Sequence, residues 1–255
     1  MSSVSRLGCI VCAGSTTNRC SSCAKAGIDI LFCSSDCQKL VWPVHKTVCG
    51  VDKANPFRWP DLKPDEVEEA IRNKGHESFP SATILTVLHR AVGLQPDHFD
   101  AYIRSLRDSA TFTPIEHYKK QATLSYIRYS AYHRTRDQLL HWSGDPTTSV
   151  LRCTAGWAFD LGPEVPHARD GLSGRTPVLH RILVHQTIMH KVFNEPDPRL
   201  LTLAKRTFDS LKVVIEEDLQ VADLERRQQA LDRLEASLSM VGRWTLTALA
   251  ESSMS

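Results

Sequence analysis

The chain has 255 residues, of which 42% are hydrophobic and 24% charged, so it can form one packed domain together with a small module. Its formal net charge of +2 argues against a nucleic-acid-binding surface that depends on excess basic charge. The chain has no run of 18 apolar residues, and we therefore expect no membrane span.

Cysteine is concentrated near the start of the chain, because seven of the eight cysteines lie within the first 49 residues. The segment before them lacks the apolar stretch of a secretory signal, so we expect no cleaved leader. A clustered, odd set of cysteines without such a signal favours reduced thiols. The sequence therefore predicts an intracellular protein of the nucleus or cytoplasm.

Metal-ligand spacing is the strongest pattern in this segment, which reads C-x2-C-x7-C-x2-C-x9-C-x3-C-x7-H-x3-C. The eight residues are Cys9, Cys12, Cys20, Cys23, Cys33, Cys37, His45 and Cys49. Eight sulfur and nitrogen ligands complete two tetrahedral sites, as structural zinc requires, whereas a catalytic zinc would keep one position open. Disulfides would need an oxidising compartment, and a redox C-x-x-C would need a βαβ setting that is absent here.

The order of the ligands is compatible with two arrangements of the metal sites. Two sequential sites are possible, although only seven residues separate the second ligand from the third. An interleaved arrangement joins distant segments and suits a module with almost no core, so we favour it. It assigns Cys9, Cys12, Cys33 and Cys37 to one Zn²⁺ and Cys20, Cys23, His45 and Cys49 to the other. Without metal the first 50 residues should be unfolded, because metal binding supplies the free energy of folding.

The eight spaced ligands, with the stretch LFCSSDCQKLVWPVHKTVC, resemble a MYND-type zinc finger over residues 9–49. The resemblance implies a small, cross-braced finger with two structural zinc ions, which would occupy residues 1–50. It also implies a protein-interaction module, because such fingers bind short proline-containing peptides of the form P-x-L-x-P along the edge of a hairpin.

The resemblance transfers peptide contacts to Gln38 and Trp42, and the expected hairpin edge adds Leu31 and Phe32. Val41 stands where relatives often carry an acid, which makes the expected groove more apolar. The alternative for Trp42 is a purely structural role as the core residue of a small module. Pro43 should interrupt the helix that contains Trp42, so we expect a new turn to begin there.

Residues 51–64 are expected to form an extended linker, within which Pro60-Asp61-Leu62-Lys63-Pro64 is itself a P-x-L-x-P segment. One hypothesis is that this segment occupies the groove of the finger, in its own chain or in a second copy. The ten residues that precede it could span about 33 Å, which is far enough to fold back. The alternative is a plain linker in which Pro64 begins the next helix.

The pattern of residues 65–255 predicts a mostly all-α domain. Expected helices cover residues 64–74, 81–93, 96–109, 114–142, 177–194, 197–219 and 221–250. An irregular loop is expected over about 143–176, with one short helix near 151–159. Leucines in the last helix follow a heptad-like stripe, which indicates a core face or a coiled-coil seam, so a homo-oligomer stays an open alternative.

The helical domain displays no catalytic motif, because G-x-S-x-G, the P-loop and G-x-G-x-x-G are all absent from the sequence. His180, His185 and His190 are five residues apart and do not share a helix face, and Cys153 has no histidine nearby in the sequence. A SET-type lysine methyltransferase, which can carry this kind of finger, would be β-rich. We therefore expect no enzyme but an adaptor or transcription-related regulator. The alternatives are an unrecognised activity in the helical domain and nucleic-acid binding by the finger.

Overall fold

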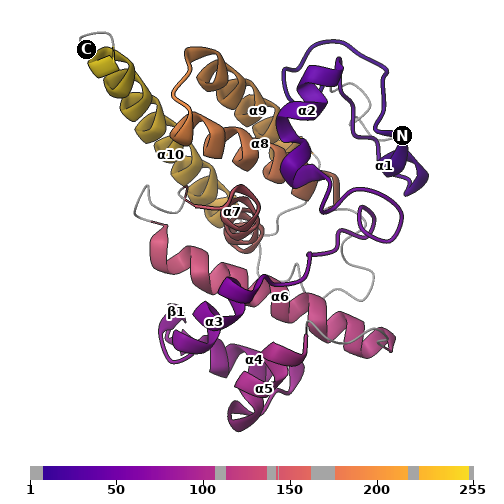
Figure 1. Cartoon of the computed structure of the whole chain (residues 1–255), viewed down its shortest axis with the longest axis vertical. Coiled ribbons are helices and arrows are strands. Elements are labelled where there is room, and N and C mark those ends of the chain that lie inside the picture. Colours follow the sequence, from indigo (N-terminus) through magenta and orange to yellow (C-terminus); the bar gives the residue numbers. More distant parts are fainter. Residues whose placement is uncertain are drawn as a thin grey trace.

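The computed structural model of the protein describes residues 8–106, 113–136, 142, 144–161, 176–217 and 224–252. Within these ranges the chain is mostly helical, as predicted, and its regular sheet is one short hairpin. An N-terminal segment, residues 8–50, contains helices α1 (Ser21–Lys25) and α2 (Ser35–His45). This segment lies along one side of the helical remainder (Figure 1).

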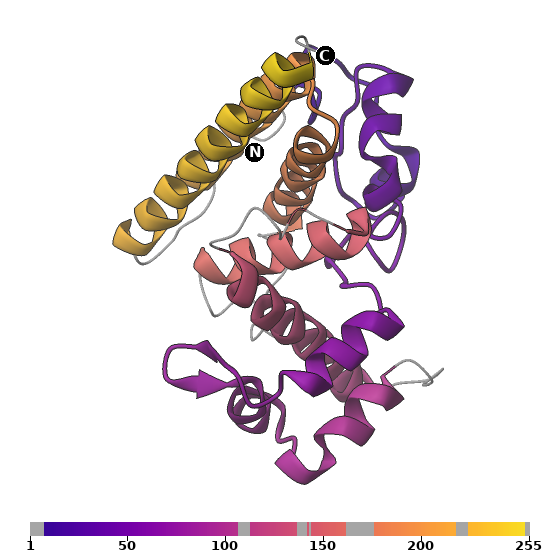
Figure 2. The ribbon, with the colours of Figure 1, turned by 60° about the vertical axis from the view of Figure 1, so that its left-hand side comes forward.

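The helical remainder has two tiers that meet at the long helix α6 (Pro114–Thr135), as Figures 1 and 2 show. The lower tier consists of the elements between the N-terminal segment and α6. They are α3 (Pro64–Arg72), β1 (Glu77–Phe79), β2 (Ala82–Thr83), α4 (Ile84–Val92), the 3₁₀ helix η2 (Pro96–His98) and α5 (Phe99–Ser105). Strands β1 and β2 are antiparallel and pair Glu77 with Thr83 and Phe79 with Ala82.

The upper tier consists of α7 (Pro146–Asp160), α8 (Thr176–Asn194), α9 (Pro198–Glu217) and α10 (Leu224–Ser252). Helix α8 lies at its centre and contacts α7, α9, α10 and also α2 of the N-terminal segment. Every residue from 178 to 190 is buried. A helix that is covered on all sides holds its neighbours in place, so α8 is the common support of the upper tier and the N-terminal segment.

Side-chain caps set the ends of several helices. The Thr113 side chain accepts the N–H of Glu116, and the Glu116 carboxylate accepts the N–H of Thr113, which is the capping box that the sequence predicts. Helix α4 begins where Thr83 Oγ1 accepts the N–H of Thr86 and ends at Gly93, whose φ of +75° is a left-handed conformation.

The irregular loop predicted over about 143–176 is wrong for residues 146–150, and the short helix predicted near 151–159 is confirmed as part of the longer helix α7. The Asp145 carboxylate accepts the N–H of Thr148, and Pro146 occupies the first turn. Gly156 lets α7 approach α6 closely, since a Cβ there would lie 2.2 Å from the Tyr132 ring. A Gly- and Pro-containing sequence can thus be helical when tertiary packing favours it. Residues 162–175 lie outside the described part of the chain.

The leucine stripe of the last helix faces the core and not a partner. Leu231, Leu234 and Val241 are at most 3% exposed, and they pack within the helical domain. The side chain of Leu224, the first residue of the stripe, lies outside the described side chains. This burial agrees with the core alternative for the stripe.

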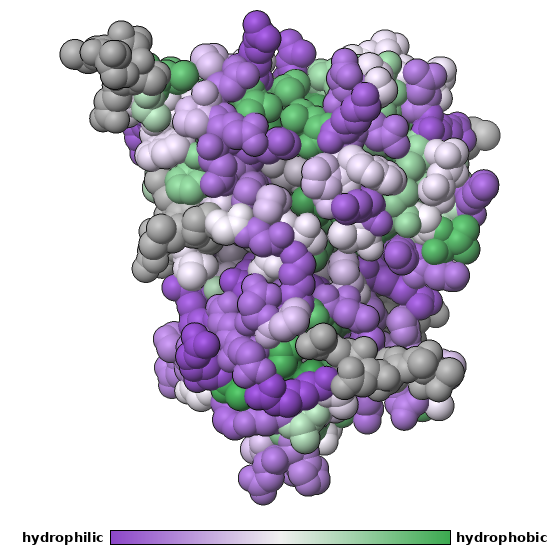
Figure 3. Space-filling model, in the orientation of Figure 1, coloured by the Kyte–Doolittle hydropathy of each residue, from purple (hydrophilic) through white to green (hydrophobic). Residues whose placement is uncertain are grey.

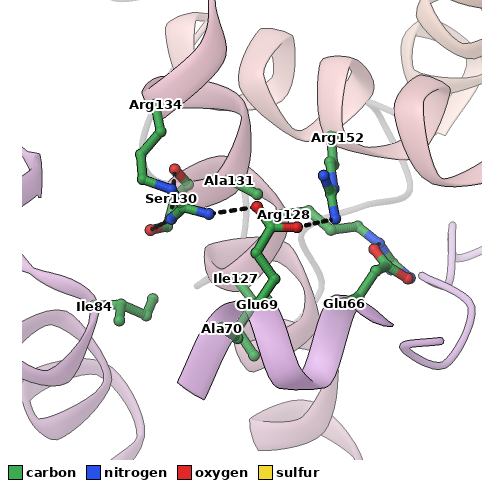
Figure 4. Close-up of a pocket in the computed structure, with 10 residues that line it drawn as sticks. All are labelled: Glu66, Glu69, Ala70, Ile84, Ile127, Arg128, Ser130, Ala131, Arg134 and Arg152. Carbon is green, nitrogen blue, oxygen red and sulfur yellow. Dashed lines mark hydrogen bonds and ion pairs between the residues drawn. The ribbon is translucent and has the colours of Figure 1, made fainter. Parts of the chain in front are cut away.

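A buried charged cluster joins the lower tier to α6 and α7, as Figure 4 shows. The side chains of Arg128 and Glu66 are 1% and 2% exposed and form an ion pair at 3.1 Å. Glu69 accepts from Arg134 at 2.6 Å and from Arg152 at 2.5 Å. The buried Glu66 and the partly exposed Glu69 therefore both have guanidinium partners, which keep α3 fixed against two helices of the domain.

The surface in the view of Figure 3 is mostly hydrophilic, and hydrophobic residues form only small patches on it. None of the described helices combines the length and the apolar character that a membrane span needs.

Candidate metal centre

Two tight turns of the N-terminal segment present the first four cysteines. In the first turn the N–H of Cys9 donates to the carbonyl of Gly14 at 2.7 Å, and the N–H of Ala13 donates to the carbonyl of Cys9 at 2.8 Å. Gly8 has to be a glycine here, because a Cβ at this position would lie 2.3 Å from the Gly14 oxygen. In the second turn α1 begins directly after Cys20 and contains Cys23.

Helix α2 presents a ligand near each of its ends, Cys37 in the first turn and His45 in the last. Ser34 Oγ accepts the N–H of Cys37 at 3.2 Å and so caps the start of the helix. The predicted interruption at Pro43 is wrong, because α2 continues through this proline to His45. Anchoring of both helix ends in the two ligand clusters can offset the hydrogen bond that proline lacks.

The structure brings the eight predicted ligands together in two groups of four, and in each group the ligand atoms lie within 4.8 Å of one another. One group is Cys9, Cys12, Cys33 and Cys37, and the other is Cys20, Cys23, His45 and Cys49. The interleaved pairing is therefore confirmed over the sequential one. Because α2 supplies Cys37 to one group and His45 to the other, the two sites share one rigid helix.

The donor atoms fit a zinc ion in each group. The sulfurs of Cys12 and Cys33 lie 3.4 Å apart, and the Cys23 sulfur lies 3.6 Å from His45 Nε2. A tetrahedral ion with Zn–S bonds of about 2.3 Å holds its sulfurs about 3.8 Å apart, so only a slight expansion is needed. All eight cysteines are free thiols, and no disulfide competes with the metal. Four ligands at each site leave no open position, which is the mark of structural zinc.

The protonation of the ligands depends strongly on the metal. Burial lowers the pKa of His45 to about 4, so Nε2 is neutral and able to bind a cation. Burial raises the pKa of Cys23 and Cys37, and neighbouring thiols raise it further. A bound divalent cation has the opposite effect and lowers the pKa of these thiols, because it favours their thiolate forms.

The pKa of the Cys9 thiol is shifted in the opposite direction from those of Cys23 and Cys37. Burial acts to raise its pKa, but backbone hydrogen bonds from Cys33, Cys12 and Val11 outweigh burial and hold the pKa below its ordinary value. Backbone N–H groups that point at the sulfur stabilise its thiolate form. The first tight turn, which contains Cys9 and Cys12, is therefore preorganised to bind a cation.

The buried side of α2, together with the turn that follows it, fixes the N-terminal segment to the helical domain. Val41, Val44 and Val48 are fully buried in the hydrophobic core, which continues into α8. Val41 was expected to make the peptide groove more apolar, but it is fully buried and cannot line an accessible groove. No role was predicted for the buried side that these three valines form. Their spacing of three and four residues could have revealed a second buried face, because it places them on one side of a helix.

The four predicted peptide-contact residues differ in their accessibility. Trp42 is 42% exposed, whereas Phe32 is 4% exposed and packs edge-on against the His45 ring at 5.8 Å between centroids. The Trp42 ring contacts the same imidazole at 5.9 Å. Gln38 and Leu31 are partly exposed. Phe32 is thus a core residue of the segment, and its side chain is not part of the accessible surface.

The expected hairpin edge is present only as an isolated antiparallel bridge between Arg19 and Leu31. The carbonyl of Leu31 already accepts the N–H of Ile10 at 2.9 Å. The Leu31 carbonyl is therefore already hydrogen-bonded to the first tight turn of the segment.

The segment Pro60–Pro64 does not occupy a groove of the N-terminal segment, so the hypothesis that it binds there in its own chain is wrong. Leu62 is 4% exposed and belongs to the helical core. Arg128 donates to the carbonyls of Pro60 at 2.9 Å and Asp61 at 3.2 Å. The chain from residue 51 to 64 is a docked part of the domain rather than a free linker, because its apolar side chains and its carbonyls find partners there.

His180 and His185 of α8 and the lone cysteine of the helical domain, Cys153, are core residues. His180 Nε2 lies 3.0 Å from the Ala54 carbonyl, and His185 Nδ1 lies 2.9 Å from Thr207 Oγ1. Burial lowers the pKa of His180 to about 4 and that of His185 to about 3. Cys153 is fully buried, and this burial raises the pKa of its thiol.

Comparison with protein families found one match, in which the family model of the MYND finger covers residues 9–49. Comparison with curated proteins and with solved structures found no match. The matched range begins at the first ligand and ends at the last, so it contains both four-residue groups. Residues 9–49 of this chain are therefore a MYND finger, a type of module that generally binds other proteins, with two structural zinc sites.

Proposed function

We propose that the chain is a non-enzymatic interaction protein whose finger binds a proline-containing, P-x-L-x-P-like segment of another protein. The exposure of Trp42 carries this proposal. Val41 and Val44 of α2 and the Phe32 side chain are already buried, so the structure does not need Trp42 as a core residue. A large aromatic side chain at the surface of a rigid helix is typical of an interface hot spot.

Helix α2 offers this side chain in a fixed orientation. Cys37 and His45 bind one metal each on either side of Trp42, and Gln38 lies one turn before Trp42. A rigid surface loses little conformational entropy when a peptide binds, which favours affinity. Gln38 can add a hydrogen bond to the peptide backbone through its side-chain amide.

A fluorescence-anisotropy titration tests the peptide site. The probe is a labelled synthetic peptide of residues 56–68, which contains Pro60-Asp61-Leu62-Lys63-Pro64, and the binding partner is the full zinc-loaded chain. We expect saturable binding that Trp42→Ala weakens by about 30-fold, as expected for a hot spot of about 2 kcal/mol. A smaller loss is expected for Gln38→Ala.

The matched control is Lys39→Ala, which removes an exposed side chain from the same helix. Equal weakening by Lys39→Ala and Trp42→Ala would contradict a specific role for the tryptophan. A peptide in which the central leucine is replaced by alanine should bind more weakly than the original. Absence of binding at millimolar protein would overturn recognition of this motif.

The role of an adaptor or transcription-related regulator in the nucleus or cytoplasm is part of the proposal. It is supported by the seven reduced thiols that the two metal groups need and by the inaccessibility of His180, His185 and Cys153. Nucleic-acid binding by the finger is the competing function. A gel-shift series at rising salt separates the two, since binding through phosphate contacts weakens steeply with salt.

A further inference from the structure

Two buried imidazoles meet where the finger contacts the helical domain. His45 of α2 and His180 of α8 are 0% and 1% exposed, and their ring centroids lie 6.1 Å apart at an interplanar angle of 63°. Helices α2 and α8 lie side by side, as Figure 1 shows. The two rings come from distant parts of the chain, so only the fold brings them together.

The position of the hydrogen on His45 follows from its role as a metal ligand. Its Nε2 atom lies 3.6 Å from the Cys23 sulfur, within the second group of ligands, so Nε2 is the atom that binds the metal. An imidazole that binds a metal through Nε2 carries its hydrogen on Nδ1. His45 Nδ1 is therefore a hydrogen-bond donor.

The position of the hydrogen on His180 follows from its contact with Ala54. His180 Nε2 lies 3.0 Å from the Ala54 carbonyl oxygen, which can only accept, so Nε2 carries the hydrogen. Burial lowers the pKa of His180 to about 4, so its ring is neutral near pH 7. A neutral imidazole with its hydrogen on Nε2 has a free electron pair on Nδ1. His180 Nδ1 is therefore a hydrogen-bond acceptor.

The two Nδ1 atoms are buried in largely aromatic surroundings. Neither atom has a hydrogen-bond partner within the part of the chain that the structure describes. Phe32 packs edge-on against His45, and Phe57 packs edge-on against His180 at 5.3 Å between ring centroids. A buried polar atom without a partner is destabilising. A donor and an acceptor in the same surroundings can remove this cost by pairing with each other.

We propose that His180 positions the metal ligand His45 by accepting a hydrogen bond from its Nδ1–H, either directly or across one buried water molecule. A bond that passes through one water molecule is nearly as favourable as a direct one. Ligating histidines generally donate their second N–H to a carboxylate, a carbonyl or water, and this bond fixes the tautomer and the orientation of the ring. In this chain a side chain of the helical domain supplies the support for a ligand of the finger.

The other contact of His180 leads back to the same metal site. Ala54, whose carbonyl accepts from His180, donates its own N–H to the Gly50 carbonyl at 2.9 Å. Burial raises the pKa of Cys23, whereas a backbone hydrogen bond from Gly50 favours its thiolate form. Hydrogen bonds in such a series polarise and strengthen one another. His180 therefore acts on the ligand group that contains Cys23 and His45.

Long-range proton–nitrogen NMR spectra of the histidine side chains test the hydrogen positions in the full zinc-loaded chain. We expect the hydrogen of His45 on Nδ1 and that of His180 on Nε2, and we expect the His45 Nδ1–H to exchange slowly with solvent. The spectrum of His180→Phe, which lacks one imidazole, assigns the signals of His180. A hydrogen on His180 Nδ1 would overturn the proposal, because His180 could then no longer accept from His45.

Chelator competition tests the effect on the metal, because it measures the affinity of each of the two zinc ions. His180→Phe keeps a buried ring but removes both nitrogens, and we expect it to bind one zinc ion about 10–100-fold more weakly and the other as the parent does. His180→Asn, whose side-chain oxygen can accept in place of Nδ1, should recover part of the lost affinity.

The matched control is His185→Phe. His185 is also fully buried on α8, but its Nδ1 lies 2.9 Å from Thr207 Oγ1, and the residue belongs to neither ligand group. We expect this variant to bind both zinc ions as the parent does. Thermal unfolding of all variants checks that the fold is retained.

Three results of the competition experiment would reduce His180 to a packing residue. The first is unchanged affinity for both zinc ions in the folded His180→Phe variant. The second is equal weakening of both ions, or the same weakening in His185→Phe, because a general loss of stability does not select one site. The third is that His180→Asn binds zinc no more tightly than His180→Phe.

Discussion

The finger and the lower tier are held to the rest of the molecule by different forces. The finger packs through the fully buried Val41 and Val44 of α2 and Val48 after it, and its own ligands form two metal groups instead of a large core. The lower tier is held by α6, to which α3 and the segment Pro60–Pro64 are joined by the buried Arg128. Apolar contacts tolerate small changes, whereas a buried charge needs its partner.

This difference predicts which region fails first under each kind of perturbation. Metal loss acts on the finger and then on α8, because the valines of α2 and α8 share one core. Loss of a single charged partner acts on the lower tier, because the remaining charge stays buried.

Removal of zinc should have the largest effect. Structural zinc contributes apparent binding free energies of about 10–16 kcal/mol in small fingers, so strong chelation should unfold residues 9–49 and expose the face of α8 that α2 covers. We expect release of two zinc ions per chain, loss of thermal stability and increased binding of a hydrophobic dye. Retention of the parent melting curve after complete chelation would show that the helical domain is independent of the finger.

Cys37→Ala and Cys153→Ala form a matched pair for that prediction, because both remove one thiol. Cys37→Ala should lower the zinc content and destabilise the finger, whereas Cys153→Ala should retain two zinc ions, since Cys153 belongs to neither ligand group. Equal zinc content in the two variants would contradict the assignment of Cys37.

Replacement of Arg128 should have the next largest effect. Arg128→Met leaves the Glu66 carboxylate buried without its partner and should lower the free energy of unfolding by about 3–5 kcal/mol in urea titrations. The double variant Arg128→Met/Glu66→Leu should recover part of this loss, although the carbonyls of Pro60 and Asp61 stay without their donor. The control Arg104→Gln breaks the exposed pair with Glu68 and should change stability little. An Arg128→Met variant with the same free energy of unfolding as the parent would show that the buried ion pair does not hold the lower tier.

Gly156→Ala should have an intermediate effect. Its Cβ would meet the Tyr132 ring at 2.2–2.6 Å, so α6 and α7 must move apart at a loss of about 1–3 kcal/mol. The control Gly242→Ala places a Cβ in ordinary contact with Leu201 at 3.6 Å and should be neutral or stabilising, because alanine favours a helix. Destabilisation of both variants to the same extent would argue against a close approach at Gly156.

Substitutions on the two faces of α2, at Val44 and at Trp42, should change stability least. Val44→Ala removes buried apolar volume and should lower the free energy of unfolding by about 2 kcal/mol. Trp42→Ala should lower it by less than about 1 kcal/mol, because much of the ring is in solvent. Thermal unfolding of both variants, with zinc content as a check, compares the faces. A larger loss for Trp42→Ala would make this ring a structural residue and remove the basis of the proposed peptide site.

The metal ligands could be predicted from the sequence because their number and spacing leave few arrangements. The eight ligands form the two expected groups, and the amphipathic patterns from Pro64 onward predicted most helices. The sequence predicted only a short helix near 151–159 in place of the full α7, because this segment contains Gly156 between polar and apolar residues without a clear period. Only contact with the Tyr132 ring gives that glycine a packing function.

The surroundings of the site could not be predicted, because they depend on contacts between distant segments. A P-x-L-x-P sequence is equally compatible with a ligand and with a docked strand, and the choice depends on Arg128, which lies far along the chain. Similarly, nothing in the stretch Leu31–Trp42 distinguishes the buried Phe32 from the exposed Trp42 before the fold is known.

The complete burial of α8 has a consequence for synthesis on the ribosome. Val41 and Val184 belong to the same hydrophobic core, but roughly 140 residues separate them along the chain, and at about 5–20 residues per second the second follows the first by roughly 10 seconds. During this interval the nascent finger can bind its metal, but the valine face of α2 has no partner. A chaperone that shields short apolar helices would have its best opportunity then, before the last three helices emerge.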